Sequence, residues 1–495
     1  MLFLKSKKET PGKCFPGASV QFSKVMAGTI SLLASLTHMA CGSGGSQSPQ
    51  LNPVPVLISV SPSSIQATSP TTTITANGSN FLSSSTVMWN GTALPTSYTG
   101  STIVTAQVSA ADLQAEGSAT IKVVNPPPGG GWSEGVTLII GAPGVTVIGV
   151  APNDLAWDPV NQVIYLSLPN TVQALNPTTG AFGISASVEN EPFLLSVSQT
   201  SKYLYVSQMG ASTVQVMTLP NLDNEATIQL GSDPYWGPLY ALDLQAAPNS
   251  DDTVAVVRGT PASSPAEVGG AIIYQNGTAL PDVLCGFGAL NCLNTSDLFD
   301  TIQWKSDATQ MYAANDETTG FDFYTISVTP PGFGAVTDYP GLLPGFYLRI
   351  HYDVTTGYVY DDDGYVVDPS SGTVVEIFPA SGLVVPDGKL GKVFILGQTE
   401  QESGTSTYTL ESFDIQNFTP IATLTIPNVV GYPTNMIRWG TNGLAFITNT
   451  EAPPIEGATY IVSSSFVSGS EAADGLAPVE NVHRAWKMRR FGNKP

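Results

Sequence analysis

One short sequence pattern returns seven times and constrains the fold of this chain more than any other feature. Each copy is a short apolar run with an aromatic or small residue at its centre, and the centres are Tyr165, Tyr205, Ala255, Tyr312, Tyr360, Phe394 and Phe446. Neighbouring copies lie 34 to 57 residues apart. Repeats of this length, with several short strands in each, are typical of a β-propeller. We therefore expect an all-β chain with a seven-bladed propeller over residues 144–470, although six or eight blades also fit the less regular copies.

A propeller must hide the strand edges where its two ends meet, because open edges pair with other chains. The run GVTVIGV, residues 144–150, precedes the inner strand of the first blade, and the last copy lacks a fourth strand after ATYIVSSSFV. We expect residues 144–150 to supply that strand and close the ring. The pattern then ends, and the basic, non-periodic residues 471–495 are expected to be disordered.

A separate all-β domain precedes the repeats. Residues 53–140 read as six or seven short alternating strands separated by turn residues, which favours an immunoglobulin-like sandwich. The segments SVSPSSI, ANGSNF, WNGT and VVNPPPGGGWSEG within this range resemble the IPT/TIG family of such sandwiches. The resemblance implies a surface or spacer domain without catalytic residues. Ala67 stands where that family commonly has glycine, which should affect only a turn.

The first two repeats carry a second resemblance. The segments LAWDPVNQVIYLSLPNTVQALNPTTG, from Leu155, and LSVSQTSKYLYVSQMGASTVQVMTLPN, from Leu195, are similar to the YVTN-type surface propellers. The similarity weakens after residue 230. It implies a propeller displayed on a cell surface and assigns no ligand.

The charge distribution argues against nucleic acid as a partner. Between Cys41 and Glu480 the chain has eight Lys or Arg against 38 Asp or Glu, a balance of −30. Such a body is repelled by phosphate backbones. Only 12% of all residues are charged, which suits an all-β protein outside the cytoplasm better than a cytosolic enzyme.

The N-terminus has the layout of an export signal. Five lysines in the first 24 residues precede the apolar stretch VMAGTISLLASLTHMA, which ends just before Cys41 and the flexible run GSGGSQSPQ. Residues 1–41 resemble a bacterial lipoprotein signal, in which Cys41 is lipidated, and residues 42–52 would be a tether. His38 departs from the aliphatic residue expected three places before that cysteine.

We therefore expect an extracytoplasmic protein at the outer membrane or cell surface, touching the membrane only through a lipid anchor. Secretion without an anchor and an ordinary linker cysteine remain alternatives. A single lipid chain anchors weakly, so stable anchoring needs further acylation.

Two further cysteines, Cys285 and Cys292, lie in the Gly-rich segment LCGFGALNC. Cysteines at this spacing in an exported protein favour a small disulfide. No second ligand pair for zinc lies nearby, and the C-x-x-C spacing of redox sites is absent. We expect no metal site and no cofactor.

The candidate binding site comes from the inner strands of the blades, which line the tunnel of a propeller. Side chains alternate between the two faces of a strand. We expect the apolar register to pack between blades and the polar register to face the tunnel. That register gathers Asp154, Ser196, Asp243, Gln245, Thr301, Gln303, Arg349, His351 and Arg438.

Five of these residues are our candidate ligand-binding set: Asp243, Gln303, Arg349, His351 and Arg438. His351 is the only histidine between Cys41 and Glu480. Arginine forks bind carboxylates and phosphates, so we expect a ligand with an anionic or hydroxyl-rich group. The alternative is that aspartates neutralise the arginines inside a wet tunnel.

Other polar clusters are weaker candidates for a functional site. The adjacent carboxyls of Asp361–Asp363 lack the alternating spacing of a calcium loop, so we interpret them, like Asn315–Glu317, as solvated hairpin turns. No nucleophile elbow, phosphate loop or zinc-protease motif occurs.

Three functions remain open. The first is a binding or adhesion module for an envelope glycan, peptide or protein. The second is an extracytoplasmic propeller enzyme, such as a lyase, lactonase or glycan hydrolase, with its site at the tunnel mouth. The third is a structural spacer.

Overall fold

The computed structural model describes residues 51–468, apart from residues 63, 116, 143, 235–236, 261–266, 286–292, 295–298, 316–318, 402–405, 442 and 451–455. The expected export signal, most of the tether and the C-terminal tail lie outside these residues. The described chain consists of strands with one short helix, α1 (Ser465–Ser468). This confirms the expected all-β fold class.

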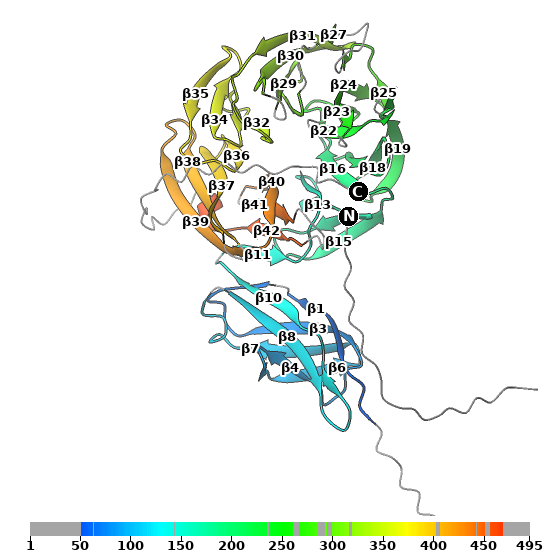
Figure 1. Cartoon of the computed structure of the whole chain (residues 1–495), viewed down its shortest axis with the longest axis vertical. Helices are drawn as coiled ribbons and strands as arrows, with labels where there is room; N and C mark the ends of the chain where they lie inside the picture. Colours follow the sequence, from blue (N-terminus) through cyan, green and yellow to red (C-terminus); the bar gives the residue numbers. More distant parts are fainter. Residues whose placement is uncertain are drawn as a thin grey trace, which may run out of the picture. The chain divides into compact units, whose positions relative to one another are not determined.

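The first domain is a sandwich of two antiparallel-dominated sheets (Figure 1). One sheet has the order β1 (Val56–Ser61), β3 (Thr72–Ser79), β7 (Ile103–Val108), β6 (Thr96–Gly100). The other has the order β2 (Ser64–Gln66), β10 (Val136–Gly141), β8 (Gly117–Asn125), β4 (Thr86–Trp89), β5 (Thr92–Ala93), with β9 (Gly131–Trp132) beside β8.

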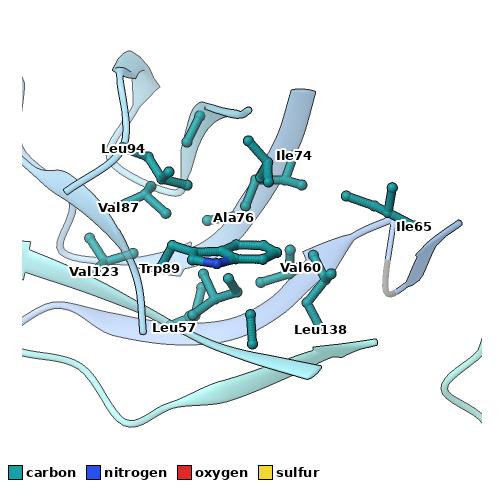
Figure 2. Packing of buried hydrophobic residues seen from close by; sticks show 14 of the residues in the cluster. Leu57, Val60, Ile65, Ile74, Ala76, Val87, Trp89, Leu94, Val123 and Leu138 are labelled. Carbon is teal, nitrogen blue, oxygen red and sulfur yellow. The ribbon is translucent and has the colours of Figure 1, made fainter. Parts of the chain in front are cut away.

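Strict alternation builds the core of this sandwich. Ile74 and Ala76 of β3 are fully buried, as are Ile121 and Val123 of β8, while the residues between them are more exposed. Figure 2 shows Trp89 at the centre of the cluster, with aliphatic side chains from both sheets around its indole ring. Burial of one apolar face of each sheet against the other therefore accounts for the domain.

The second domain is built from sheets in which consecutive strands are hydrogen-bonded neighbours (Figure 1). We call these sheets blades and number them in chain order. Blade 1 contains β12 (Asp154–Asp158), β13 (Val163–Leu168), β14 (Thr171–Leu175) and β15 (Phe182–Ser187). Blade 2 contains β16 (Pro192–Val197), β17 (Tyr203–Gln208), β18 (Thr213–Thr218) and β19 (Asp223–Gln229).

Blade 3 is the least regular sheet. It contains β22 (Tyr240–Ala246), β23 (Thr253–Thr260), β24 (Glu267–Gln275), β25 (Thr278–Ala279), β26 (Leu284–Cys285) and β27 (Leu293–Asn294). A small two-stranded sheet precedes it, formed by β20 (Ser232–Asp233) and β21 (Gly237–Pro238). Blade 4 is a regular meander of β28 (Thr301–Trp304), β29 (Gln310–Ala314), β30 (Phe323–Thr329) and β31 (Gly332–Tyr339).

The next two blades follow the same meander. Blade 5 contains β32 (Ile350–Tyr352), β33 (Val359–Asp361), β34 (Tyr365–Asp368) and β35 (Thr373–Ile377). Blade 6 contains β36 (Leu383–Asp387), β37 (Lys392–Gln401), β38 (Ser406–Asp414) and β39 (Pro420–Val429).

Blade 7 joins the two ends of the domain. It consists of β40 (Tyr432–Trp439), β41 (Gly443–Asn449), β42 (Thr459–Val462) and β11 (Val145–Ile148). Strand β11 pairs antiparallel with β42, from Val145 opposite Val462 to Ile148 opposite Thr459. The expectation that residues 144–150 complete the last sheet is therefore confirmed.

The first strands of the blades form a closed ring. Each contacts the first strand of the next blade, and β40 contacts β12 to complete the circle visible in Figure 1. Every neighbouring pair of blades also shares its own buried apolar cluster. These contacts show a β-propeller.

One part of the strand-parity expectation is wrong. Leu155 packs with Trp439 of blade 7, whereas the next residue, Ala156, packs with Leu195 of blade 2. Blades stack face to face, so both faces of an inner strand meet a neighbouring blade. The cavity on the axis is consequently lined along the edges of the inner strands, by residues of both registers.

Candidate binding cavity

A cavity of about 270 Å³ lies inside the ring of inner strands. Residues of blades 1, 2, 3, 4, 5 and 7 line it. Its polar lining residues are Asp154, Ser196, Asp243, Gln245, Thr301, Gln303, Arg349, His351 and Asn435. The structure thus brings together Asp243, Gln303, Arg349 and His351 from the candidate set. The volume is at the small end of ligand pockets, which suits the end group of a ligand rather than a long chain.

The inner position of these strands explains why acceptors gather there. An inner strand is a sheet edge, and its outward backbone N–H groups need partners. Asp154 Oδ2 accepts the N–H of Leu195 at 2.9 Å, and Ser196 Oγ accepts the N–H of Ala246 at 2.9 Å. Each bond joins one blade to the next, so these side chains connect the ring as well as line the cavity.

Asp243 makes the same connection from blade 3 to blade 4. Its Oδ2 accepts the backbone N–H of Ile302 at 2.8 Å. Its Oδ1 accepts the N–H of Leu244 at 2.7 Å and the side-chain amide of Gln245 at 3.3 Å. Both carboxylate oxygens are therefore engaged within the protein.

Asp154 is the most deeply buried charged group on the cavity, at 5% exposure. Burial raises the pKa of its carboxyl, while the Arg349 charge, the Leu195 N–H and the Asn435 amide act in the opposite direction. Asn435 Nδ2 donates to Asp154 Oδ1 at 2.6 Å. This carboxyl thus connects blade 1 to blades 2 and 7 and compensates the charge of Arg349.

His351 is held by an aspartate that we expected in a solvated turn. Its Nε2 lies 3.2 Å from Oδ1 of Asp362. The Asp362 carboxylate also accepts the backbone N–H groups of Arg349, at 3.1 Å, and Val384, at 3.0 Å. Asp362 therefore fixes the cavity strand of blade 5 and joins it to blade 6.

The interpretation of Asp361 as part of a solvated turn is also wrong. Asp361 is 1% exposed, and burial raises the pKa of its carboxyl well above the ordinary value. Its Oδ1 accepts the N–H groups of Asp363 and Tyr365. The tight turn between β33 and β34 folds this side chain inward. Asn315, from the other expected turn, is likewise buried, whereas Asp316 and Glu317 lie outside the described residues.

Arg438 does not line the cavity, which corrects its placement in the candidate set. Its Nε donates to Oδ2 of Asp387 at 2.7 Å. Its terminal nitrogens donate to the carbonyls of Gly443, Thr441 and Val467. Arg438 thereby joins blade 6, the β40–β41 turn and α1. Asn435, Met436 and Ile437 are the residues of β40 that line the cavity, and Arg438 lies one residue beyond them.

The sequence reasoning missed several cavity residues, among them Asn435 and Trp157. Asn435 lies on β40, the same inner strand as Arg438, but it was not among the polar residues expected at the tunnel. Trp157 was assigned to packing between blades, yet it lines the cavity and is only partly buried. Its ring centroid lies 6.1 Å from that of Trp439. Gln303 is also partly exposed, and within the described residues its amide has no hydrogen-bond partner.

The described residues test only part of the cysteine predictions. Cys285 is disulfide-bonded. Cys292 and Cys41 lie outside the described residues, so their pairing and lipidation stay predictions. Over the described ranges, no three His, Cys, Asp or Glu side chains are grouped to hold a metal ion. Within the same ranges, no helix has the length and apolar character needed to cross a membrane.

Comparison with known proteins identifies the first domain. Residues 55–140 match the IPT/TIG domain model. No curated protein matches the chain.

Solved structures are similar to parts of this chain. One is the β-propeller domain of Cps50 (Swd1) from Myceliophteria thermophila, with 10% identity and a TM-score of 0.45 over 64% of this chain and 98% of that one. Another is hydrazine synthase from Kuenenia stuttgartiensis, with 13% identity and a TM-score of 0.33 over 61% of this chain and 77% of that one. Similarity at this level carries no argument about activity.

Proposed function

We propose that this protein is an extracytoplasmic binding or adhesion module that takes the end of an envelope glycan or peptide into its axial cavity. The observation that carries the proposal is the cavity itself, where polar side chains from six blades converge within about 270 Å³. Both domain types are typical of binding and interaction modules. The propeller supplies a rigid ring, and in the sequence the IPT/TIG domain lies between the expected anchor and the propeller.

The hydrogen bonding favours binding over catalysis. A general base or nucleophile needs a carboxylate or imidazole that is available to substrate. Both oxygens of Asp154 and of Asp243 already accept hydrogen bonds from the protein. These groups are held as parts of the ring, whereas the Gln303 amide remains to contact a ligand.

The first test is ligand binding by the purified full chain, without its export signal, against a panel of envelope glycans and peptides. We expect a specific ligand to raise the melting temperature, because it binds only the folded state. Gln303→Ala should abolish that rise. Gln229→Ala, on the exposed outer strand β19, is the matched control and should leave it unchanged. A ligand whose effect survives Gln303→Ala, or a panel with no binder, contradicts the proposal.

The expected membrane location has a separate test. The lipoprotein-like layout of residues 25–41 supports lipidation of Cys41. We expect Cys41→Ser to release the protein from isolated membranes into the soluble fraction, because the variant lacks the thiol that would carry the lipid anchor. Fractionation followed by immunoblotting measures this. Equal membrane retention of the variant argues against the anchor.

A further inference from the structure

The cavity carries a slight excess of negative charge before any ligand enters. Its charged lining residues are Asp154, Asp243 and Arg349, together with the titratable His351. The charge of Arg349 acts on the Asp154 carboxyl, so this arginine is already compensated. Asp362 lies directly behind His351. An acidic ligand would therefore meet the Asp243 carboxylate without a compensating cation, in a partly desolvated space where repulsion is strong. This argues against the anionic ligand considered from the sequence.

A cationic ligand fits little better. An ammonium group brings three donors and needs acceptors to receive them. Each oxygen of Asp154 and of Asp243 already accepts a donor from the protein. An amine there would have to share carboxylate oxygens that already join neighbouring blades. It would also place a second cation near Arg349.

The side chains that remain available to hydrogen-bond a ligand, Thr301 and Gln303, are neutral. Thr301 and Gln303 are alternate residues of β28 and both line the cavity. A glutamine amide and a threonine hydroxyl each offer a donor and an acceptor. Sugar hydroxyls are donors and acceptors in the same way, so they match this pair without any net charge.

The cavity also has an apolar side. Trp157, Leu194, Val197 and Ile437 line it beside the polar groups. The C–H face of a pyranose ring is apolar and packs well on an indole, which buries a large apolar area with a defined geometry. A peptide end presents such a face only through proline or an aromatic side chain, and its terminus is charged.

From charge, hydrogen bonding and volume together, we infer that the axial cavity binds the uncharged terminal sugar of an envelope glycan. Trp157 packs against the apolar face of the ring, and Gln303 contacts its hydroxyls. This deepens the proposed function and rests on it. About 270 Å³ accommodates one sugar unit, so the rest of the glycan extends out of the cavity.

Titration calorimetry with the purified full chain carrying Cys41→Ser tests the inference. The probes are methyl glycosides of glucose, galactose and mannose, the matched uronic acids, glucosamine, and short peptides. We expect at least one neutral glycoside to bind about tenfold or more tightly than its uronic acid. Trp157→Ala and Gln303→Ala should each weaken that binding about tenfold, whereas Trp157→Phe retains most of it. Melting temperatures establish that each variant is folded.

The outcomes separate the two claims. If a uronic acid, amine or peptide binds best and Gln303→Ala removes that binding, the neutral-sugar inference is overturned and the cavity function stands. If a ligand binds equally well to both alanine variants, or nothing binds, the cavity function is overturned as well. Should Trp157→Ala fail to fold, Gln303→Ala alone decides the role of the cavity, and the ranking of neutral against charged probes decides the ligand class.

Discussion

The centre of the sandwich and the centre of the propeller are built from the same kind of strand but have opposite chemistry. The sandwich centre is a single apolar cluster around Trp89. The propeller centre is a cavity with carboxylates, amides and a guanidinium. Two sheets packed face to face cover each other, whereas a ring of blades turns one edge of every sheet toward the axis. Edges expose backbone amides, and these require polar partners.

This difference predicts that the two centres respond differently to mutation. Changes in the sandwich core should affect stability and leave ligand binding intact. Changes to available cavity groups, such as the Gln303 amide, should affect binding and leave stability nearly intact. The following variants test that separation, in order of decreasing effect.

The largest effect is expected for Trp89→Ala. Trp89 is 6% exposed, and removing a buried indole costs about 3–5 kcal/mol of unfolding free energy. Amide hydrogen exchange of strand β7 against strand β17 measures the loss in each domain separately. Ligand affinity should not change. Trp132→Ala, at a site 51% exposed, is the control and should shift stability by no more than about 0.5 kcal/mol.

Arg438→Ala should be next, with a loss of about 3 kcal/mol in the propeller. The variant leaves the Asp387 carboxylate, 15% exposed, without its arginine, and also removes donors from three carbonyls. Chemical denaturation measures the loss, with the exposed Lys389→Ala as a basic control. A fall in ligand affinity at unchanged stability would place Arg438 in the binding site after all.

The smallest effect is a change in pH dependence from Asp361→Asn. Burial raises the folded-state pKa of Asp361 above 3.8, so the folded state holds its proton more tightly than the unfolded chain does. The stability this proton provides is present below the unfolded pKa and is lost as pH rises through the folded pKa. Asparagine cannot ionise, so the variant should lack this decline.

Asp368→Asn provides a control of opposite sign. Hydrogen bonds from Ser370 lower the pKa of Asp368, so its stabilising contribution is lost in acid. Thermal melts from pH 3 to pH 8 compare both variants with the parent protein. Equal slopes for Asp361→Asn and the parent would show that Asp361 is ionised in the folded state at neutral pH.

The fold was largely predictable because its signals are local. Alternating apolar residues gave the strands of both domains, and the missing strand after residues 459–462 pointed to residues 144–150. The placement of Asp243, Gln303, Arg349 and His351 at the axis followed from their positions on the inner strands. Such patterns depend only on neighbours along the chain.

The errors arose where geometry depends on distant residues. The part of β40 that lines the cavity ends at Ile437, one residue before Arg438, and no residue type marks this limit. Asp362 belongs to a hairpin turn by sequence, yet it contacts His351 because the pairing of Asp361 with Ile350 brings it beside the inner strand. Asn435 gains its role only because Asp154, far away in the chain, lies beside it.

The pairing of β11 with β42 has a consequence for how the protein folds during its synthesis. Val145 and Val462 are partners although more than 300 residues separate them, so strand β11 emerges from the ribosome long before its mate exists. Until β42 is synthesised, the ring is open and has two unpaired strand edges that can pair with other chains. A chain truncated before β42 would keep both unpaired edges. We expect it to be degraded by proteases or to aggregate rather than to form a smaller functional protein.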